Sequence, residues 1–331
     1  MIYLKNLTKM AFLTSVVISL SACNGGGGGS SGGSNPTPTP TTTPSPTPSQ
    51  WTQVGVAPDL FSDNLMYDGA TNQLFMGIGA SGNTLCSISA NATSTDDWDC
   101  SIRPPQNLYK ATNYTTDGNG HIYILGELFL SNDWNIYTYS TQTKTWNTQL
   151  MNNDITDYDG WYYSNGSLYY ANNQLYARTV NLSTGDVGYY TPLNPNGSSD
   201  LHKTTALNGI VYYQGILASM IYSRDIQSSQ TSAQFGKPSG SISSITGMEQ
   251  NIYICGGGDS GGFVSYLPVG SNASAEWNKL PPVYSEVLPP NVLFQPGCLF
   301  MTSGNGYLFV YNLVRYPEID QVKAVVMKYK I

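Results

Sequence analysis

Charged side chains are scarce in this sequence. Asp, Glu, Lys and Arg make up 11% of its 331 residues, against about 25% in typical soluble domains. The bases are few and scattered, and none form a basic or basic-aromatic stripe, which argues against nucleic acid as a partner. Only two histidines are present, His121 and His202. Any Ser-His-Asp triad would have to use one of them, and no catalytic residue is predicted.

Sustained helical patterns are also missing. Pro or Gly interrupts nearly every candidate segment, and strand formers alternate with turn formers through most of the chain. The polarity comes instead from 25 tyrosines and from Asn, Ser, Thr and Gly. Aromatic and β-branched residues favour strands, so the composition predicts an all-β fold.

The first apolar run is too short to span a membrane as a helix. Met10 to Leu20 provides eleven residues, whereas a transmembrane helix needs about 20. Lys5 and Lys9 lie at its start and small residues at its end. This is the layout of a secretory signal, and the export it implies sets the chemistry expected of the cysteines.

The end of this signal, Leu20-Ser21-Ala22-Cys23, resembles a bacterial lipobox. The resemblance implies that Cys23 is acylated and that residues 1–22 are removed, leaving a lipoprotein held on a membrane by acyl chains, palmitate among them. Each buried CH₂ contributes about 0.8 kcal/mol to such an anchor. Asn24 replaces the aspartate that retains such proteins at the inner membrane, which implies the outer membrane of the bacterial cell envelope. The alternative is an ordinary secretory signal cut after Ala22.

A segment of simple composition follows the lipobox. Residues 24–50 are almost wholly Gly, Ser, Pro and Thr, and such a segment cannot bury enough apolar surface to repay the entropy of ordering. We predict that residues 23–50 form a disordered linker that begins at the lipidated cysteine. Residues 51–331 would then form the folded domain.

Six units repeat along the folded domain. Each has a turn followed by an apolar or aromatic strand, and the aliphatic members of these strands are 48, 46, 43, 41 and 56 residues apart. Asn-Gly between strand-like runs is the strongest short-range hairpin signal. The six segments are Asn72 to Phe75, Asn119 to Tyr123, Asn165 to Tyr169, Asn208 to Tyr212, Gln250 to Tyr253 and Asn305 to Phe309.

A tryptophan opens the last strand of several units, as Trp98, Trp146 and Trp277 do. With Gly256-Gly257 after an earlier strand, this pattern resembles the kelch family of β-propellers. The resemblance implies six blades in a closed ring. The last unit has no such tryptophan strand, and Trp51-Thr52-Gln53-Val54 at the start of the domain is predicted to supply it. Three β-sandwich domains, or a seventh blade, are the alternatives.

Four cysteines remain once Cys23 is set aside. An even number in an exported protein favours disulfides. Cys86 and Cys100 lie 14 residues apart in one unit, on strands expected to be neighbours. Cys255 and Cys298 fall in adjoining units, and we favour these two pairings among the three possible. No Cys-x-x-Cys spacing is present, which makes a metal site less favoured.

Acidic and aromatic residues cluster in one stretch, Asp157, Asp159 and Trp161. Part of a calcium loop is matched there, but Ile155 holds the first ligand position, so no metal and no cofactor is predicted. On the propeller template this stretch lies on the same face as Asp133 and Trp134, and carboxylates beside exposed rings are typical of carbohydrate recognition. The alternative is that Trp161 is buried and the acids are solvated loop residues.

These observations predict an outer-membrane lipoprotein that displays a six-bladed propeller and binds a glycan or a protein partner. One alternative is a sugar-processing enzyme, either an epimerase or a glycosidase-like protein. Another is a structural subunit of an envelope assembly.

Overall fold

The computed structural model describes residues 51–57, 62–78, 84–105, 108–128, 134–151, 158–172, 177–190, 203–214, 220–225, 231–236, 240–258, 261–283, 293–316 and 321–331. The chain divides into two units, Met1–Thr47 and Pro48–Ile331, and every described residue belongs to the second. Cys23 and the predicted linker lie outside the described residues. No helix among them is long and apolar enough to cross a membrane.

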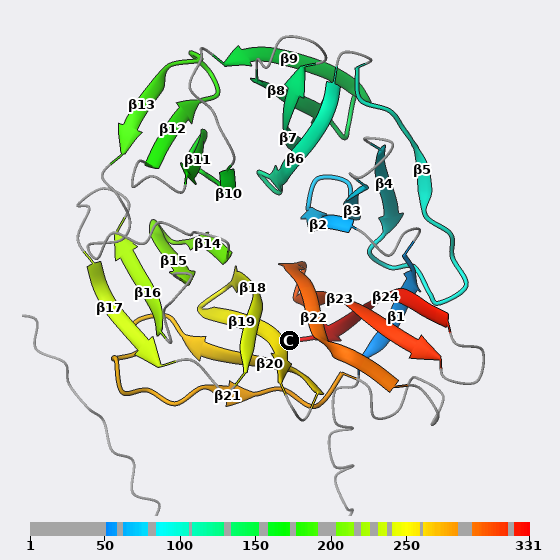
Figure 1. Cartoon of the computed structure of the whole chain (residues 1–331), viewed down its shortest axis with the longest axis vertical. Helices are drawn as coiled ribbons and strands as arrows, with labels where there is room; N and C mark the ends of the chain where they lie inside the picture. The colour runs from blue at the N-terminus through cyan, green and yellow to red at the C-terminus, as the bar shows by residue number, and fades with distance from the viewer. Residues whose placement is uncertain are drawn as a thin grey trace, which may run out of the picture. The chain divides into compact units, whose positions relative to one another are not determined.

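The described residues form six four-stranded antiparallel sheets, which are the blades of a ring (Figure 1). Blade one comprises β2 (Ser62–Asp68), β3 (Gln73–Ile78), β4 (Thr84–Ser89) and β5 (Asp99–Ile102). Blade two comprises β6 (Leu108–Thr116), β7 (His121–Leu128), β8 (Trp134–Ser140) and β9 (Thr145–Met151). Blade three comprises β10 (Tyr158–Ser164), β11 (Ser167–Asn172), β12 (Ala177–Asn181) and β13 (Val187–Tyr190).

The remaining blades follow the same order from the inner to the outer strand. Blade four comprises β14 (Lys203–Leu207), β15 (Ile210–Gln214), β16 (Met220–Asp225) and β17 (Thr231–Gly236). Blade five comprises β18 (Ser241–Met248), β19 (Asn251–Gly258), β20 (Gly261–Pro268) and β21 (Asn278–Lys279). Blade six comprises β22 (Leu293–Gly304), β23 (Tyr307–Tyr316), β24 (Gln321–Lys330) and, as its outer strand, β1 (Thr52–Val56).

Closure of the ring uses the two ends of the domain. Strand β1 pairs antiparallel with β24, with Thr52 opposite Lys328 and Val56 opposite Val325. Closing a ring leaves only short, protected edges and no blade with an uncovered face. The six-bladed all-β propeller and its N-terminal closing strand are therefore confirmed.

The turns between the first and second strands explain the repeated Asn-Gly pairs. In blade three, Ser164 pairs with Ser167, so Asn165 and Gly166 alone form the turn. Their φ angles are 48° and 79°. The tight hairpin turn needs positive φ at both central positions, which Asn and Gly adopt at low cost. The same pair makes the corresponding turn in blades four and six, at Asn208-Gly209 and Asn305-Gly306.

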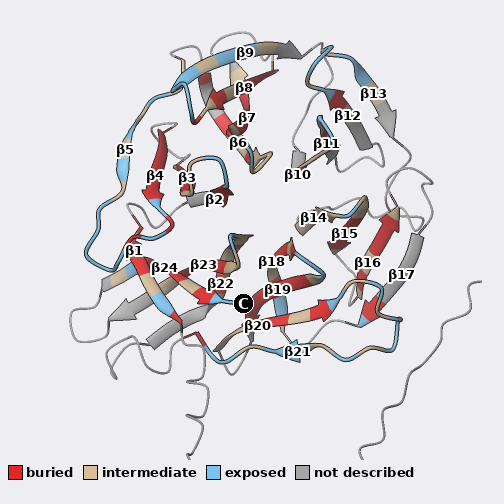
Figure 2. Ribbon diagram, turned by 180° about the vertical axis from the view of Figure 1, so that it is seen from behind, coloured by how far each residue is buried: buried red, intermediate tan, exposed pale blue. Residues whose placement is uncertain are grey.

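The apolar core is divided among the joints between blades. Because alternate side chains of a strand point to opposite sheet faces, Leu74 packs toward blade six while Phe75 packs toward blade two. Each of the six apolar clusters of the described residues combines side chains of two adjoining blades. Figure 2 shows exposed residues along the outer strands β5, β9 and β21. Stability of this ring depends on six separate interfaces.

Tryptophans at the outer strands contact the preceding blade. The indole Nε1 of Trp277 donates a hydrogen bond to the Gly236 carbonyl at 2.5 Å, which joins blade five to blade four. Trp51 donates to the Pro281 carbonyl at 2.9 Å and joins blade six to blade five. The predicted position of these tryptophans at the start of the fourth strand is confirmed, and their function is to cover joints.

Both predicted disulfides are present. Cys86–Cys100 links β4 to β5 within blade one, with Cα atoms 4.1 Å apart. Cys255–Cys298 links β19 of blade five to β22 of blade six, with Cα atoms 5.7 Å apart. The first bridge holds an outer strand on its own blade, whereas the second joins two blades.

Candidate functional site

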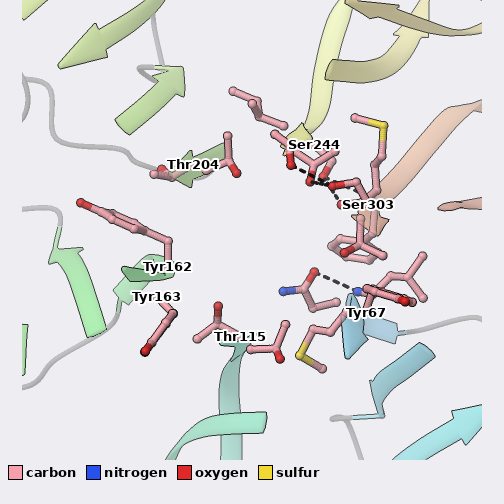
Figure 3. A pocket seen from close by; sticks show the side chains of 18 of the residues that line it. Tyr67, Thr115, Tyr162, Tyr163, Thr204, Ser244 and Ser303 are labelled. Carbon is pink, nitrogen blue, oxygen red and sulfur yellow. Dashed lines mark hydrogen bonds between the residues drawn. The ribbon is translucent and has the colours of Figure 1, made fainter. Parts of the chain in front are cut away.

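The inner strands of all six blades surround a cavity of about 580 Å³ (Figure 3). Each inner strand is the last strand of its sheet, so one of its edges has no strand partner. Such an edge presents backbone N–H and C=O groups. The topology alone therefore makes the wall of this cavity polar.

Hydroxyl side chains dominate the described lining. They are Thr115, Thr116, Thr204, Thr205, Ser243, Ser244, Thr246, Thr302 and Ser303. Only two charged side chains, Asp117 and Lys203, are among the described lining residues. The cavity is thus polar but poor in charge, as the composition of the whole chain is.

Part of the hydroxyl lining is used to join blades five and six. Ser244 Oγ accepts a hydrogen bond from the Met301 N–H at 3.1 Å. Ser303 Oγ donates to the Gly247 carbonyl at 2.9 Å and lies 3.2 Å from Thr246 Oγ1. These bonds cross between β18 and β22, so the groups that make them serve the ring itself.

Blades six, one and two are joined beside the cavity by different contacts. Asn64 Nδ2 donates to the Tyr114 carbonyl at 2.7 Å, which links β2 to β6. The Tyr67 ring lies so close to Gly304 that a Cβ at that position would overlap it. A side chain larger than hydrogen at Gly304 would displace the ring from the joint.

Four lining hydroxyls have no such use. Among the residues that the structure describes, the side chains of Thr115, Thr205, Ser243 and Thr302 make no hydrogen bond to the protein. They come from β6, β14, β18 and β22, so they belong to four different blades. Each is only partly buried and available to a molecule in the cavity.

The tyrosine rings of β10 turn away from the cavity centre into the joints. Tyr162 stacks on Tyr169 with ring centres 5.0 Å apart, and Tyr163 stacks on Tyr123 at 5.9 Å. Figure 3 shows the two adjacent rings pointing to opposite sides, as neighbouring residues of a strand must. The stacked faces are occupied, which leaves ring edges and hydroxyls toward the cavity.

Asp117 holds the turn between β6 and β7. Its Oδ1 accepts from the Asn119 and His121 backbone N–H groups at 2.8 and 3.0 Å, and its Oδ2 lies 2.8 Å from His121 Nδ1. The Tyr123 hydroxyl donates to the same Oδ2 at 3.4 Å. Burial first, and then the nearby Asp117 carboxylate, raise the pKa of Tyr123. The phenol therefore stays protonated and remains a donor to Asp117.

The other charged lining residue is engaged as well. The Lys203 ammonium group, in blade four, donates to the Ile242 carbonyl in blade five. Its charge is therefore directed at a joint between blades. Neither Lys203 nor Asp117 is placed as an isolated charge facing the cavity.

The five predicted ligand-binding residues do not coincide with this cavity. Trp134 begins β8, is half-buried, and packs on the cluster that joins blades two and three. Asp159 and Trp161 lie in β10, where the structure describes the backbone but not these side chains. Asp133 and Asp157 lie outside the described residues. Their grouping as a binding site stays a prediction.

Strand directions place these positions relative to the cavity. β6 and β7 are joined by a turn at one face of the ring, so β7 ends at the other face, where β8 begins and β9 ends. The chain then enters β10 from that second face. Trp134 and the first residues of β10 consequently lie on the face opposite the Asn-Gly turns.

Two other motifs carry no chemistry in the described residues. Gly258 to Gly262 matches Gly-x-Ser-x-Gly, which the interpretation of the sequence overlooked. Gly258 pairs with Gly261 in the antiparallel hairpin of β19 and β20, and a nucleophile elbow requires a strand followed by a helix. No cluster of three or more His, Cys, Asp or Glu residues suited to a metal occurs within the described part of the chain.

No family model matches this sequence, and no curated protein matches it. Solved structures do resemble it. The Pan2 WD40 domain of Neurospora crassa has a TM-score of 0.53 at 8% identity, over 86% of this chain and 96% of that chain. The structure of U3-55K has a TM-score of 0.52 at 9% identity, over 85% and 98%. A chain of the mitotic checkpoint complex has a TM-score of 0.50 at 8% identity, over 86% and 94%.

Identities this low show the fold alone, and the fold they show is the propeller. The WD40 domain among them has blades of the same kind without a shared kelch pattern being required. Membership of the kelch family accordingly stays a prediction.

Proposed function

We propose that this chain is a lipid-anchored binding protein of the bacterial cell envelope, and that its propeller recognises a glycan or a protein partner. The observation that carries the proposal is the convergence of six inner strands on one polar cavity. Binding sites are typically concave regions with a few placed polar groups. In the described residues the cavity offers hydrogen-bonding groups, and its two charged side chains already have protein partners.

The anchor part of the proposal comes from the sequence. Cys23 occupies the lipidated position of the lipobox, and the Gly-, Ser-, Pro- and Thr-rich segment after it suits a flexible connection to the domain. Such an arrangement would let the propeller reach ligands at a distance from the membrane. The outer membrane is proposed because Asn24 follows the cysteine.

Replacing Cys23 with Ser tests the anchor directly. Without the thiol no acyl chain is attached, and the protein is expected to move from the detergent phase to the aqueous phase in phase partitioning. Ser31→Ala, within the predicted linker, serves as the control and should partition as the wild type does. Equal detergent partitioning of the Cys23→Ser variant and the wild type would show that no lipid anchor exists.

The protein-partner option has support from one similar structure, because that propeller was solved within the mitotic checkpoint complex. The glycan option is supported by the hydroxyl-rich cavity and by the predicted acidic and aromatic cluster. A single experiment addresses both. The full chain is immobilised and exposed to a bacterial envelope extract, with heat-unfolded protein as the control.

Portions of the same extract are treated beforehand with protease or with periodate, which cleaves the vicinal diols of sugars. Retained material that periodate abolishes is a glycan, and retained material that protease abolishes is a protein. Either result supports the proposal. Retention no greater than that on the heat-unfolded control would overturn it.

A further inference from the structure

The four hydroxyls without a protein partner define a more specific ligand than the cavity as a whole does. Thr115, Thr205, Ser243 and Thr302 come from blades two, four, five and six, so they approach the cavity from different sides. A hydroxyl group donates one hydrogen bond and accepts others. A ligand that satisfies all four must therefore carry both donors and acceptors around its periphery.

Charge on the ligand is disfavoured by the lining. Asp117 Oδ2 is paired with His121 Nδ1 at 2.8 Å, and the Lys203 ammonium group is bonded to a carbonyl. An ion moved from water into a confined site requires an opposite charge or several strong hydrogen bonds. The described lining presents neither a free cation for an acidic ligand nor a free carboxylate for a basic one.

An apolar ligand is disfavoured too. The rings of Tyr162 and Tyr163 are stacked on neighbouring tyrosines, and the Phe300 ring packs 5.9 Å from that of Tyr311. The large apolar faces near the cavity are thus already in contact with protein. The volume of about 580 Å³ falls in the range of about 300–1,000 Å³ typical of small-molecule sites.

We infer that the central cavity binds a short neutral oligosaccharide through the hydroxyls of Thr115, Thr205, Ser243 and Thr302. This inference rests on the proposed binding function and names its ligand class. Sugar hydroxyls donate and accept hydrogen bonds in every direction, and a neutral saccharide needs no ionic partner. The backbone groups along the free edges of the inner strands supply further donors and acceptors.

The test uses the full chain on an array of immobilised oligosaccharides. Neutral glucans, mannans, galactans and chitin fragments form one set, and sialylated and sulfated glycans form the other. Thr115→Val and Thr302→Val remove a hydroxyl at nearly constant shape. Thr148→Val is the matched control because Thr148 is an exposed residue of the outer strand β9.

The wild type is expected to bind members of the neutral set and not the acidic set. Each cavity valine should weaken that binding about three- to tenfold, as loss of one neutral hydrogen bond does, and the double variant should weaken it further. The control should bind as the wild type does. Circular dichroism and the melting temperature verify folding, and Ser243→Ala replaces any variant that fails to fold.

Binding confined to acidic glycans, or no glycan binding at all, would overturn the inference. So would neutral binding that the cavity variants leave at wild-type strength, because the sugar site would then lie elsewhere. In that last case, and where a protein is retained from the envelope extract, the proposed binding function stands without this ligand. Absence of both glycan binding and extract retention would remove the two proposals together.

Discussion

The joint between blades five and six differs in chemistry from the joint between blades three and four. The first has the Cys255–Cys298 disulfide, the bonds from Ser244 and Ser303, and the Trp51 indole bonded across the outer strands. The second is packed by a small cluster whose buried members are Tyr162, Val211 and Tyr213. The two joints occupy equivalent positions in one ring, so equal topology does not imply equal reinforcement.

The outer strands show the same difference. β21 and β1 follow directly after Trp277 and Trp51, which contact the preceding blade. β13 of blade three opens instead with Val187, which is 37% exposed. Regions with fewer buried contacts open at lower free energy. We therefore expect the ring to open locally at blades three and four before it opens at blades five and six.

The joint between blades six and one closes the ring and adds a third kind of contact. Lys328 Nζ donates to the Ala90 and Ala92 carbonyls at 3.1 and 3.4 Å. Burial lowers the pKa of Lys328, and its ammonium group lies 5.9 Å from the Tyr307 ring centre. A charged side chain thus anchors the turn after β4 to the strand that pairs with β1.

Removing the closing strand should have the largest effect on this comparison. Deletion of residues 51–56 takes away Trp51 and Val54, which are 3% and 0% exposed, and leaves β24 as an open edge. Loss of one buried Trp alone costs about 3–5 kcal/mol. The melting temperature is expected to fall by more than about 10 °C, measured by circular dichroism or calorimetry.

Deletion of residues 25–29, in the predicted linker, is the control for that experiment and should leave the melting temperature unchanged. A loss of less than about 2 °C on removing residues 51–56 would mean that closure by β1 does not stabilise the ring. The strong joint between blades five and six would then owe nothing to Trp51.

The two disulfides sharpen the comparison at the next level. Replacing Cys255 and Cys298 with Ser should cost about 2–5 kcal/mol, since removal of a native bridge commonly does. The Cys86 and Cys100 pair closes 14 residues rather than 43. The chain-entropy relation gives the longer loop about 1 kcal/mol more stabilisation. Urea unfolding at a constant m-value measures both losses, and a larger loss for the shorter loop would contradict the expectation.

Much of this architecture is specified by local sequence. Asn165-Gly166 and its counterparts determine their own turns through positive φ, and Trp51 with its following residues carries the pattern of an outer strand. The disulfides follow from cysteines placed on neighbouring strands. In each case the chemistry acts within one unit or between adjoining units.

The cavity is a different matter, because its lining combines residues that no local pattern relates. Ser244 and Met301 lie 57 positions apart, and their bond exists only because β18 and β22 are neighbours in the ring. The six strand edges become a binding surface only after closure. Sequence reasoning searched instead for acidic and aromatic residues close together in the chain, and so it passed over scattered serines and threonines.

A buried carboxylate at the joint between blades one and two gives the smallest of the expected effects. Asp68 is 0% exposed. It accepts hydrogen bonds from the Gly120 N–H at 2.7 Å and from the Thr141 hydroxyl at 2.8 Å, both in blade two. It also accepts from the Thr71 hydroxyl and the Ala70 N–H of its own turn. This one side chain therefore ties the inner turns of two blades.

The pKa of Asp68 gives that joint a pH dependence. Burial by itself would raise the pKa, but the hydrogen bonds from Thr71, Thr141, Gly120 and Ala70 favour the carboxylate and bring the pKa below the usual 3.8. A group whose pKa is lower in the folded state stabilises fully above its unfolded value, and that stabilisation is lost as the pH falls through the folded value. The effect is thus confined to pH values below about 4.

Asp68→Asn should weaken the joint by about 1–3 kcal/mol at pH 7, because a neutral amide replaces a charged acceptor. Urea midpoints measured from pH 7 to pH 2 should converge for variant and wild type as the wild-type carboxylate becomes protonated. Asp186→Asn, an exposed residue beside β13, is the control and should change stability little at pH 7. If Asp68→Asn and the control behave alike, the joint between blades one and two is held by its apolar cluster alone. It would then resemble the joint between blades three and four rather than the disulfide-linked one.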